Sequence, residues 1–310
     1  MLVTGATGFV GSHLVAELLS RGADVAGSAR RRPPGPGHEA ISFFQGDLTE
    51  IGSAGDLIRS TRPDTVIHLA ATLVGAPDLD DGLGGFGGTL RGTASLCEAV
   101  AADAPTARVV VLSSSAVYGQ PVSLPVAEGA PVRPLTTYGV SKAAQELLAL
   151  RWRWAGDLDF VVVRSFNLVG PGMPRHLVLG DVARQLATGR QQAVTVEVGN
   201  LTPRRDYLDV RDLATALAGI TLLAEAPPIL NVAAGKSWSV GEVVERMVEL
   251  SGGTATVRQS EERRRYRDII DQVGDTSLLA DLTGWSPTFD LDRSLADLLA
   301  GAANAGEGCP

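Results

Sequence analysis

Three glycines at intervals of three residues separate a short apolar run from an amphipathic segment at the start of the chain. The run MLVT precedes Gly5, Gly8 and Gly11 in GATGFVG, and HLVAELLSRG follows. Glycine permits a tight turn and lets backbone N–H groups approach a pyrophosphate, which the N-terminus of the next helix also attracts. The motif predicts a strand, turn and helix that bind a dinucleotide; the alternative is a glycine turn with only a structural role.

Further apolar runs alternate with amphipathic segments along the first half of the chain. The runs are ADVAGSA, DTVIHLAA, RVVVLSS and FVVVRSFN, and they are continuous rather than alternating, as buried parallel strands are. This order predicts an α/β protein with a doubly wound parallel sheet. We expect the sheet domain at 1–168 with a return at 206–232, and a smaller, more irregular α/β lobe at 169–310.

Composition excludes several classes of protein. A net charge of −8 and a pI near 5.1 argue against binding to nucleic acid or to an anionic membrane surface. No apolar window approaches the roughly 20 residues of a membrane span. With no secretory leader visible after Met1, we expect a cytoplasmic protein. Cys97 and Cys309 lack metal-ligand spacing, so no metal site is expected, and Cys97 is interpreted as a small buried residue.

The stretch TYGVSK places Tyr138 and Lys142 four residues apart in a segment with helical spacing. Side chains at that spacing share one face of a helix, so the ammonium would lie near the phenol. We expect the positive charge, together with that of an oxidised nicotinamide, to lower the pKa of Tyr138. Tyr138 would then exchange a proton with a substrate oxygen while a hydride moves at carbon.

Several motifs in one order carry a resemblance to a known family. The glycine motif, Asp47-Leu48, VIHLAA at 66–71, SSSAVYG, TYGVSK, RSFNLVGPG and RRDYLDVRD follow one another over most of the chain. The sequence resembles extended short-chain dehydrogenases/reductases, in the NAD-dependent epimerase/dehydratase branch that modifies nucleotide sugars. Within that branch it is most similar to the GDP-4-keto-6-deoxymannose reductase type. The resemblance implies a Rossmann domain with a sugar-nucleotide lobe.

The resemblance also implies which residues contact the cofactor. They are Gly5, Thr7, Gly8, Phe9, Val10, Gly11, Asp47, Leu48, Leu69, Ala70, Ala71, Ser165 and Phe166.

The end of the second expected strand favours NADP(H) over NAD. An acid about 20 residues beyond the glycines would bind a ribose 2′-hydroxyl, whereas a basic residue suits a 2′-phosphate. The chain has Ser28, Arg30 and Arg31 there, and the nearest acid, Asp24, comes too early. The alternative is that 30–32 form a solvated loop, with NAD as the cofactor.

The serines before Tyr118 supply a third catalytic position. By the family's pattern, the hydroxyl four residues before this tyrosine is Ser114, which would polarise a sugar carbonyl; Ser115 is the alternative and a substrate contact. In the 4,6-dehydratases of this family an acid stands two residues before the tyrosine, and here that residue is Ala116. Because eliminating water needs both an acid and a base, dehydration is disfavoured.

Two arginines and an amide are expected to bind the nucleotide sugar. Arg205 and Arg265 match arginines that clamp the pyrophosphate, and Asn167 matches a substrate-contacting amide. A guanidinium donates two hydrogen bonds to phosphate at once. Arg267 is a rival of Arg265, because Tyr266 replaces the usual proline; the alternative for ERRRYRD is a solvated charged helix face.

These patterns together predict an NADPH-dependent oxidoreductase that reduces the 4-keto group of a GDP- or dTDP-linked 4-keto-6-deoxyhexose in deoxysugar biosynthesis. The alternatives are a nucleotide-sugar 4-epimerase with bound NAD and, outside enzymes, an NADP-sensing regulator. A homodimer is expected through helices around 91–103 and 139–155. The glycine-rich stretch at 78–88 is interpreted as either a mobile lid or a disordered connection.

Overall fold

A computed structural model describes residues 1–31, 40–71, 82–188, 194–263 and 268–306. Its centre is a seven-stranded sheet in the order β10-β6-β5-β4-β1-β2-β3, in which every neighbouring pair is parallel. The strands are β1 Leu2–Thr4, β2 Ala26–Ala29, β3 Ser42–Gln45, β4 Thr65–His68, β5 Arg108–Ser114, β6 Asp159–Ser165 and β10 Ile229–Val232.

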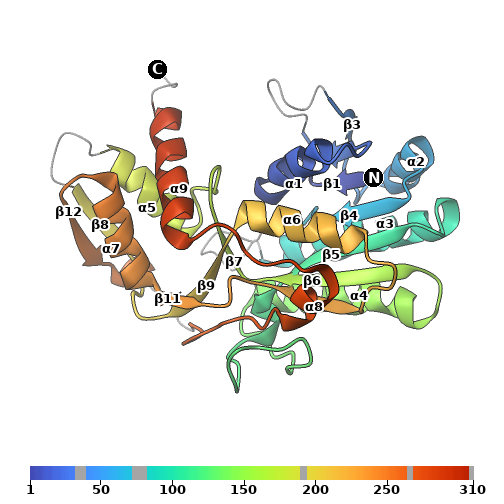
Figure 1. The fold of residues 1–310 in the computed structure, drawn as a ribbon. Coiled ribbons are helices and arrows are strands. Elements are labelled where there is room, and N and C mark those ends of the chain that lie inside the picture. Colours follow the sequence, from blue (N-terminus) through green and yellow to red (C-terminus); the bar gives the residue numbers. More distant parts are fainter. Residues whose placement is uncertain (32–39, 72–81, 189–193, 264–267, 307–310) are drawn as a thin grey trace.

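Helices cover both faces of this sheet (Figure 1). Successive residues of β5 and β6 enter different cores: Val110 and Val161 face one side, while Val109 and Val162 face the other. Burial on both faces explains why the strands are continuously apolar. One face carries α1 Phe9–Ser20 and α6 Val210–Thr221, and the other carries α2 Ser53–Thr61, α3 Gly82–Asp103 and α4 Thr137–Trp154.

A smaller lobe lies beside the sheet domain, on the left of Figure 1. It contains a three-stranded sheet in the order β11-β9-β7 and a parallel pair of β12 and β8. Its helices pack around a separate apolar core. The elements are β7 Asn167–Val169, α5 Val178–Thr188, β8 Val194–Val198, β9 Arg204–Asp209, β11 Ser237–Ser239, α7 Val240–Ser251, β12 Ala255–Gln259, η3 Glu261–Arg263 and α9 Leu291–Gly306.

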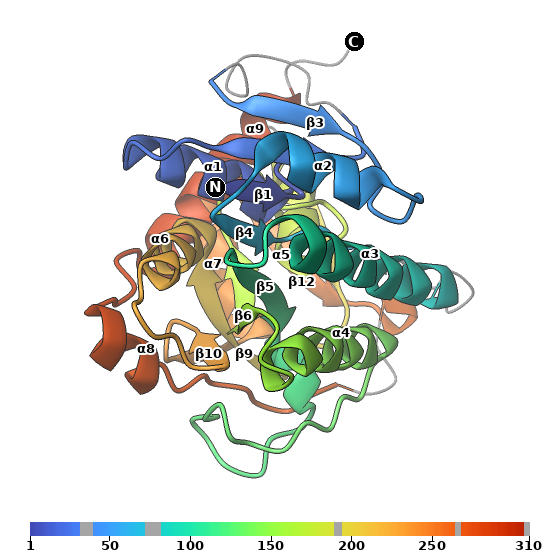
Figure 2. The same ribbon diagram turned by 90° about the vertical axis from the view of Figure 1, so that its right-hand side faces the viewer.

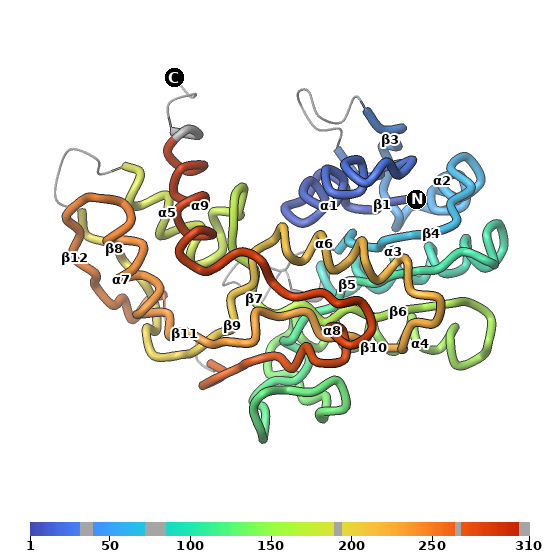
Figure 3. Tube along the Cα trace, viewed as in Figure 1, coloured from blue at the N-terminus to red at the C-terminus, as the bar shows by residue number. Residues whose placement is uncertain are grey.

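The chain passes between the two lobes more than once (Figure 3). After β9 it forms α6 and β10 on the large sheet, and α8 Ser277–Thr283 packs beside β10 before the chain returns to α9. The predicted fold class is confirmed.

The glycine-rich stretch differs from its prediction. Residues 82–88 form the start of α3 instead of a loop, while 78–81 lie outside the described residues. From residue 82 onward the interpretation as a lid or a disordered connection is therefore wrong, because helical backbone hydrogen bonds order this stretch despite its glycines.

Candidate active site

The glycine motif forms the predicted turn between β1 and α1. Backbone N–H groups of Gly5 and Ala6 donate to the Ser28 carbonyl oxygen, at 2.7 and 3.1 Å. Gly5 has a φ of +72°, and a Cβ on Gly11 would lie 2.2 Å from the Gly5 oxygen. Side chains are therefore excluded where the turn approaches α1.

The N-terminus of α1 is available to an anion. Within the described residues no side chain caps α1, and its first turn holds no acidic residue. The free N–H groups and the positive end of the helix dipole both favour a phosphate. The turn and helix end therefore fit the pyrophosphate of a dinucleotide.

The other predicted cofactor segments meet at this edge of the sheet. Leu69 N–H donates to the Thr4 carbonyl oxygen at 3.2 Å, and Ala70 N–H donates to Thr4 Oγ1 at 3.3 Å. Asp47 accepts from Thr49 N–H and Oγ1, and the backbone bond is the main reason that its pKa is lowered. The Asp47 carboxylate therefore orders its own turn beside β2.

Arg30 and Arg31 follow directly after β2. Both arginine side chains are exposed, and the charge of Arg30 helps to lower the pKa of Asp47. Ser28 differs from both because it lies inside β2, is only 5% exposed, and contacts the glycine turn through its carbonyl. Of Ser28, Arg30 and Arg31, the two arginines therefore have the polar side chains that a ligand can reach.

Three consecutive serines have three different partners. Ser113 donates to Glu146 Oε1, and Ser115 donates to Gln272 Oε1 at 2.9 Å. Ser114 ends β5, accepts from Ala116 N–H at 3.2 Å, and has its hydroxyl close enough to Tyr138 to lower the pKa of the phenol. Ser115 is buried in this structural contact, which corrects its predicted role at the substrate.

Tyr138 and Lys142 lie on the first turns of α4, which Thr136 caps by accepting from Gly139 N–H at 3.0 Å. Burial raises the pKa of Tyr138, although the hydrogen bond with Ser114 lowers it. The predicted lowering by Lys142 is wrong for the chain alone, because desolvation penalises the phenolate. The further lowering of the Tyr138 pKa that is expected from oxidised nicotinamide would require the bound cofactor.

The Lys142 ammonium is buried beneath the site. It donates to the Leu112 carbonyl oxygen at 2.8 Å and to Gln145 Oε1 at 2.9 Å. Burial lowers the pKa of Lys142 to about 8, although the charge of Glu146 raises it. Lys142 therefore titrates much closer to neutrality than an exposed lysine.

Glu146 is a buried residue that the sequence interpretation missed. It accepts from Arg164 Nη2 at 2.6 Å, and both side chains are 3% exposed. Its place four residues after Lys142, on the same face of α4, is a signal that could have identified it. The pair ties α4 to β6 directly behind the triad of Ser114, Tyr138 and Lys142.

The predicted substrate residues lie where β6 enters the small lobe. Ser165 and Phe166 are buried, and Phe166 N–H donates to the Val232 carbonyl oxygen at 3.0 Å. Asn167 follows as an exposed residue of β7, which pairs with β9. Of these three residues, Asn167 is the most accessible to a ligand.

Arg205, on β9, contacts the segment that follows Arg265, the second arginine predicted to clamp the pyrophosphate. Its Nη1 donates to the Ile269 carbonyl oxygen at 2.6 Å, and its Nη2 lies 3.6 Å from Asp268. Arg265 and its rival Arg267 lie outside the described residues. Arg205 is thus held against residues 268 and 269, and its predicted pairing with a second arginine stays a prediction.

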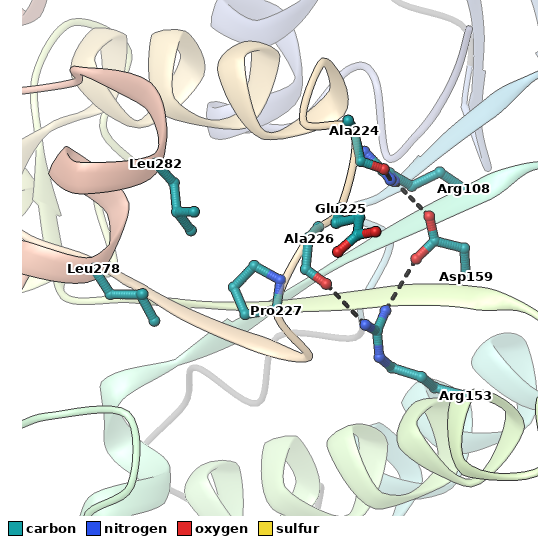
Figure 4. A pocket seen from close by; sticks show the side chains of 9 residues that line it. All are labelled: Arg108, Arg153, Asp159, Ala224, Glu225, Ala226, Pro227, Leu278 and Leu282. Carbon is teal, nitrogen blue, oxygen red and sulfur yellow. Dashed lines mark hydrogen bonds and ion pairs between the residues drawn. The ribbon is translucent and has the colours of Figure 1, made fainter.

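A pocket of about 540 Å³ lies at the opposite edge of the sheet (Figure 4). Arg108 and Asp159, at the amino ends of β5 and β6, form an ion pair of 2.7 Å, and Arg153 donates to Asp159 at 3.0 Å. Arg153 also donates to the Ala226 carbonyl oxygen. Ligands of parallel sheets bind at the carboxyl ends of the strands, so we interpret these arginines as structural.

Comparison with known proteins agrees with this geometry. A model of the NAD dependent epimerase/dehydratase family matches residues 1–233. The chain belongs to this family. The predicted family resemblance is thereby confirmed.

Two curated relatives match nearly the whole chain. A GDP-6-deoxy-D-mannose reductase of Pseudomonas aeruginosa is 33% identical, over 97% of this chain and 96% of the relative. A dTDP-6-deoxy-L-talose 4-dehydrogenase (NAD(P)(+)) of Kitasatospora kifunensis is 32% identical, over 98% and 95%.

Two solved structures share the fold. RMD from Pseudomonas aeruginosa, complexed with NADPH, has a TM-score of 0.82 and 31% identity, covering 98% of this chain and 97% of that chain. A UDP-glucose 4-epimerase of Thermus thermophilus, complexed with NAD, has a TM-score of 0.87 and 28% identity, covering 98% and 99%.

Two features are absent from the described residues. No helix there has the length and apolar character needed to cross a membrane. Likewise, in the described ranges no three His, Cys, Asp or Glu side chains gather as a metal site would require.

Proposed function

We propose that the protein reduces the 4-keto group of a nucleotide-linked 4-keto-6-deoxyhexose with NADPH. The observation that carries this proposal is the triad itself: the Ser114 hydroxyl lies close enough to Tyr138 to lower its pKa, and Lys142 is buried four residues along α4. The triad lies at the sheet edge that also holds the glycine turn. A relative named GDP-6-deoxy-D-mannose reductase supports the substrate class, because a 6-deoxyhexose with a 4-hydroxyl is what reduction of the 4-keto group would form.

Each member of the triad has a separate task in this proposal. A bound NADPH supplies the hydride that adds to C4. Ser114 donates a hydrogen bond to the carbonyl oxygen, Tyr138 donates its proton to that oxygen as it becomes a hydroxyl, and Lys142 stabilises the phenolate that remains. The raised pKa of Tyr138 keeps it protonated, as an acid requires.

We assign the remaining contacts by position. Residues 1–168 with 206–232 would bind the cofactor, and 169–310 would supply most contacts to the nucleotide sugar. Arg30 and Arg31 would bind the 2′-phosphate of NADPH, and Ser28 would contribute only backbone. Asn167, Arg205 and Arg265 would hold a GDP- or dTDP-linked sugar.

The test is turnover of a ketone. Purified protein is mixed with NADPH and GDP- or dTDP-linked 4-keto-6-deoxyhexose, and absorbance of NADPH is followed. We expect oxidation of NADPH matched by formation of the 4-hydroxy sugar. Absence of oxidation with both nucleotides would refute the reductase.

A 4-epimerase is the second candidate, because a UDP-glucose 4-epimerase shares the fold over nearly all of both chains. An epimerase retains NAD through its catalytic cycle. Protein that copurifies with tightly bound NAD, and converts a UDP-hexose without added cofactor, would establish this candidate instead.

We also propose a cytoplasmic homodimer. In Figure 2, α3 and α4 lie side by side on one face of the sheet. Along α4, Val140, Leu147 and Trp154 are 44%, 60% and 67% exposed. Light scattering at micromolar concentration should give twice the mass of one chain, and a Leu147→Glu variant should give the monomer mass.

A further inference from the structure

A line of buried polar side chains joins the active-site lysine to the strand that precedes the glycine turn. Its members are Lys142 and Gln145 on α4, Thr93 on α3, His68 at the end of β4 and Thr4 at the end of β1. All five are at most 5% exposed. Buried polar groups at this density need mutually consistent hydrogen bonds.

The distances make the line continuous. Lys142 Nζ lies 2.9 Å from Gln145 Oε1, and Gln145 Nε2 lies 2.9 Å from Thr93 Oγ1. His68 Nε2 lies 3.0 Å from Thr93 Oγ1 on the other side. Thr4 Oγ1 then lies 2.7 Å from His68 Nδ1.

Assigning the Thr93 hydroxyl hydrogen to the Thr89 carbonyl oxygen gives every bond in the line a consistent direction. The one hydroxyl hydrogen of Thr93 is donated to the Thr89 carbonyl oxygen at 2.8 Å. Thr93 Oγ1 is therefore only an acceptor toward Gln145 and His68, and both must donate to it. His68 is then protonated on Nε2 alone, and its Nδ1 accepts from the Thr4 hydroxyl.

A neutral His68 agrees with its surroundings. Burial, and secondly the charge of Lys142, lower the pKa of His68 to about 3. A neutral His68 with its proton on Nε2 satisfies this assignment, with Thr93 as its acceptor.

The fixed direction determines what Gln145 presents to the lysine. With its NH₂ group committed to Thr93, Gln145 can offer Lys142 only its carbonyl oxygen. Leu112 and Gln145 use two of the three ammonium hydrogens, and among the described residues no further partner of Nζ is recorded, which leaves one hydrogen for the site.

We propose that Gln145, oriented by Thr93 and neutral His68, is a positioning residue that aims the Lys142 ammonium at the active site. The proposal rests on the role of Lys142 in the proposed function. The titratable groups facing Lys142 are His68 on β4 and Tyr138 and Glu146 on α4, and the Glu146 carboxylate is already held by Ser113 and Arg164.

The sequence offers a direct measurement, because Lys142 and Lys236 are its only lysines. Protein labelled with ¹³Cε-lysine should give two resonances, and Lys236→Arg assigns them. A pH titration of the Lys142 resonance reports its pKa without substrate or turnover.

Two changes at Gln145 should move that pKa in opposite directions. Gln145→Leu removes an acceptor from the ammonium and should lower the pKa by about one unit, a tenfold change in the protonation equilibrium. Gln145→Glu places a carboxylate beside the ammonium and should raise it by about one unit or more. With substrate, Gln145→Leu should lower kcat about tenfold and leave KM for the sugar unchanged.

A second pair of variants tests the orientation step. Thr93→Val removes the acceptor that directs Gln145 and should shift the Lys142 pKa as Gln145→Leu does. Thr93→Ser keeps the hydroxyl and should restore the wild-type titration.

The matched control is Gln185→Leu, at a buried glutamine of α5 whose amide bonds to Asp181 and Glu197. It should lower Tm without moving the Lys142 resonance. If Gln145→Leu and Thr93→Val also lower Tm and leave the Lys142 pKa unchanged, Gln145 is only structural and the proposal is overturned. If the ketone assay fails but the variants shift the Lys142 pKa as expected, the proposed function alone is refuted.

Discussion

At the scale of single residues, hydrogen-bond partners separate side chains that the sequence leaves equivalent. Ser113, Ser114 and Ser115 are adjacent, yet it is the Ser114 hydroxyl that lowers the pKa of Tyr138. Ser113 is committed to Glu146, and Ser115 to Gln272. Chemistry is thus assigned by where each hydroxyl points, which depends on strand pleat and on the turn that follows β5.

The role of Tyr138 can be tested by removing one oxygen. Tyr138→Phe should lower kcat at least a hundredfold, because the proton donor is lost, while NADPH affinity stays near that of the wild type. Stopped-flow turnover and fluorescence titration measure the two quantities. Tyr118→Phe is the control: its buried hydroxyl bonds to Asn231, so it should cost stability and not kcat. Equal kcat losses in both variants would contradict the assignment.

Cofactor choice is a second prediction at this scale. Arg30→Ala should raise KM for NADPH about tenfold and leave KM for NADH unchanged, since only NADPH carries the 2′-phosphate that Arg30 would bind. Steady-state kinetics with both cofactors measure this change. Arg21→Ala, at the exposed C-terminal cap of α1, serves as the surface control. An equal rise in KM for NADPH and for NADH would show that Arg30 does not bind the 2′-phosphate.

At the scale of elements, a buried ion pair fixes α4 against the sheet. Glu146 on α4 accepts from Arg164 on β6 and from Ser113 on β5, so one carboxylate joins three elements. This junction lies directly behind the triad, and the angle at which α4 presents Tyr138 and Lys142 depends on it.

Removing the Glu146 carboxylate from this junction should destabilise the protein. Glu146→Ala leaves the Arg164 charge buried and unpaired, which should lower the free energy of unfolding by about 3–5 kcal/mol. Urea denaturation provides the measurement. Glu249→Ala breaks the exposed pair with Arg246 and should change stability by less than about 0.5 kcal/mol. Similar losses of unfolding free energy in the two variants would mean that the buried Glu146–Arg164 pair stabilises the fold no more than an exposed pair does.

At the scale of the whole molecule, two buried titratable groups on different lobes oppose each other as pH falls. The pKa of His68 is lowered from 6.5 to about 3, chiefly by burial. The pKa of Asp206 is raised from 3.8 to about 6, also chiefly by burial, although it accepts N–H bonds from Ala234, Gly235 and Gly274. These groups lie in the sheet domain and on β9.

The signs follow from which state binds more protons. Below pH 6.5 the unfolded chain protonates His68 and the folded chain does not, so His68 lowers the free energy of unfolding by about 2 kcal/mol between pH 7 and pH 5. Below pH 6 the folded chain protonates Asp206 first, which raises stability by about 1 kcal/mol over the same interval.

Variants should separate the two effects. Relative to wild type, His68→Gln should lose less stability between pH 7 and pH 5, and Asp206→Asn should lose more. Urea denaturation at the two pH values measures each difference, with Arg21→Ala as a surface control. Unchanged pH slopes in both variants would show that neither group governs the acid response.

Much of the fold and of the site was predictable, and for local reasons. Continuous apolar runs, glycine spacing and a Tyr138–Lys142 interval of one helical turn are properties of short segments. The starting residues of α3 were missed because their glycines have low helix propensity, which tertiary context overrides. Ser115 and the pKa of Tyr138 were misjudged because burial is not a local property.

The sequence by itself determined the alternation of strands and helices, the dinucleotide turn and the order of the candidate catalytic groups, since each depends on residues close together in the chain. Only the tertiary structure decided which serine meets Tyr138 and that Gln145, Thr93 and His68 support Lys142. Apart from the Lys142–Gln145 bond within α4, these interactions join residues from 24 to 74 positions apart and arise when four elements pack, so no local pattern contains them.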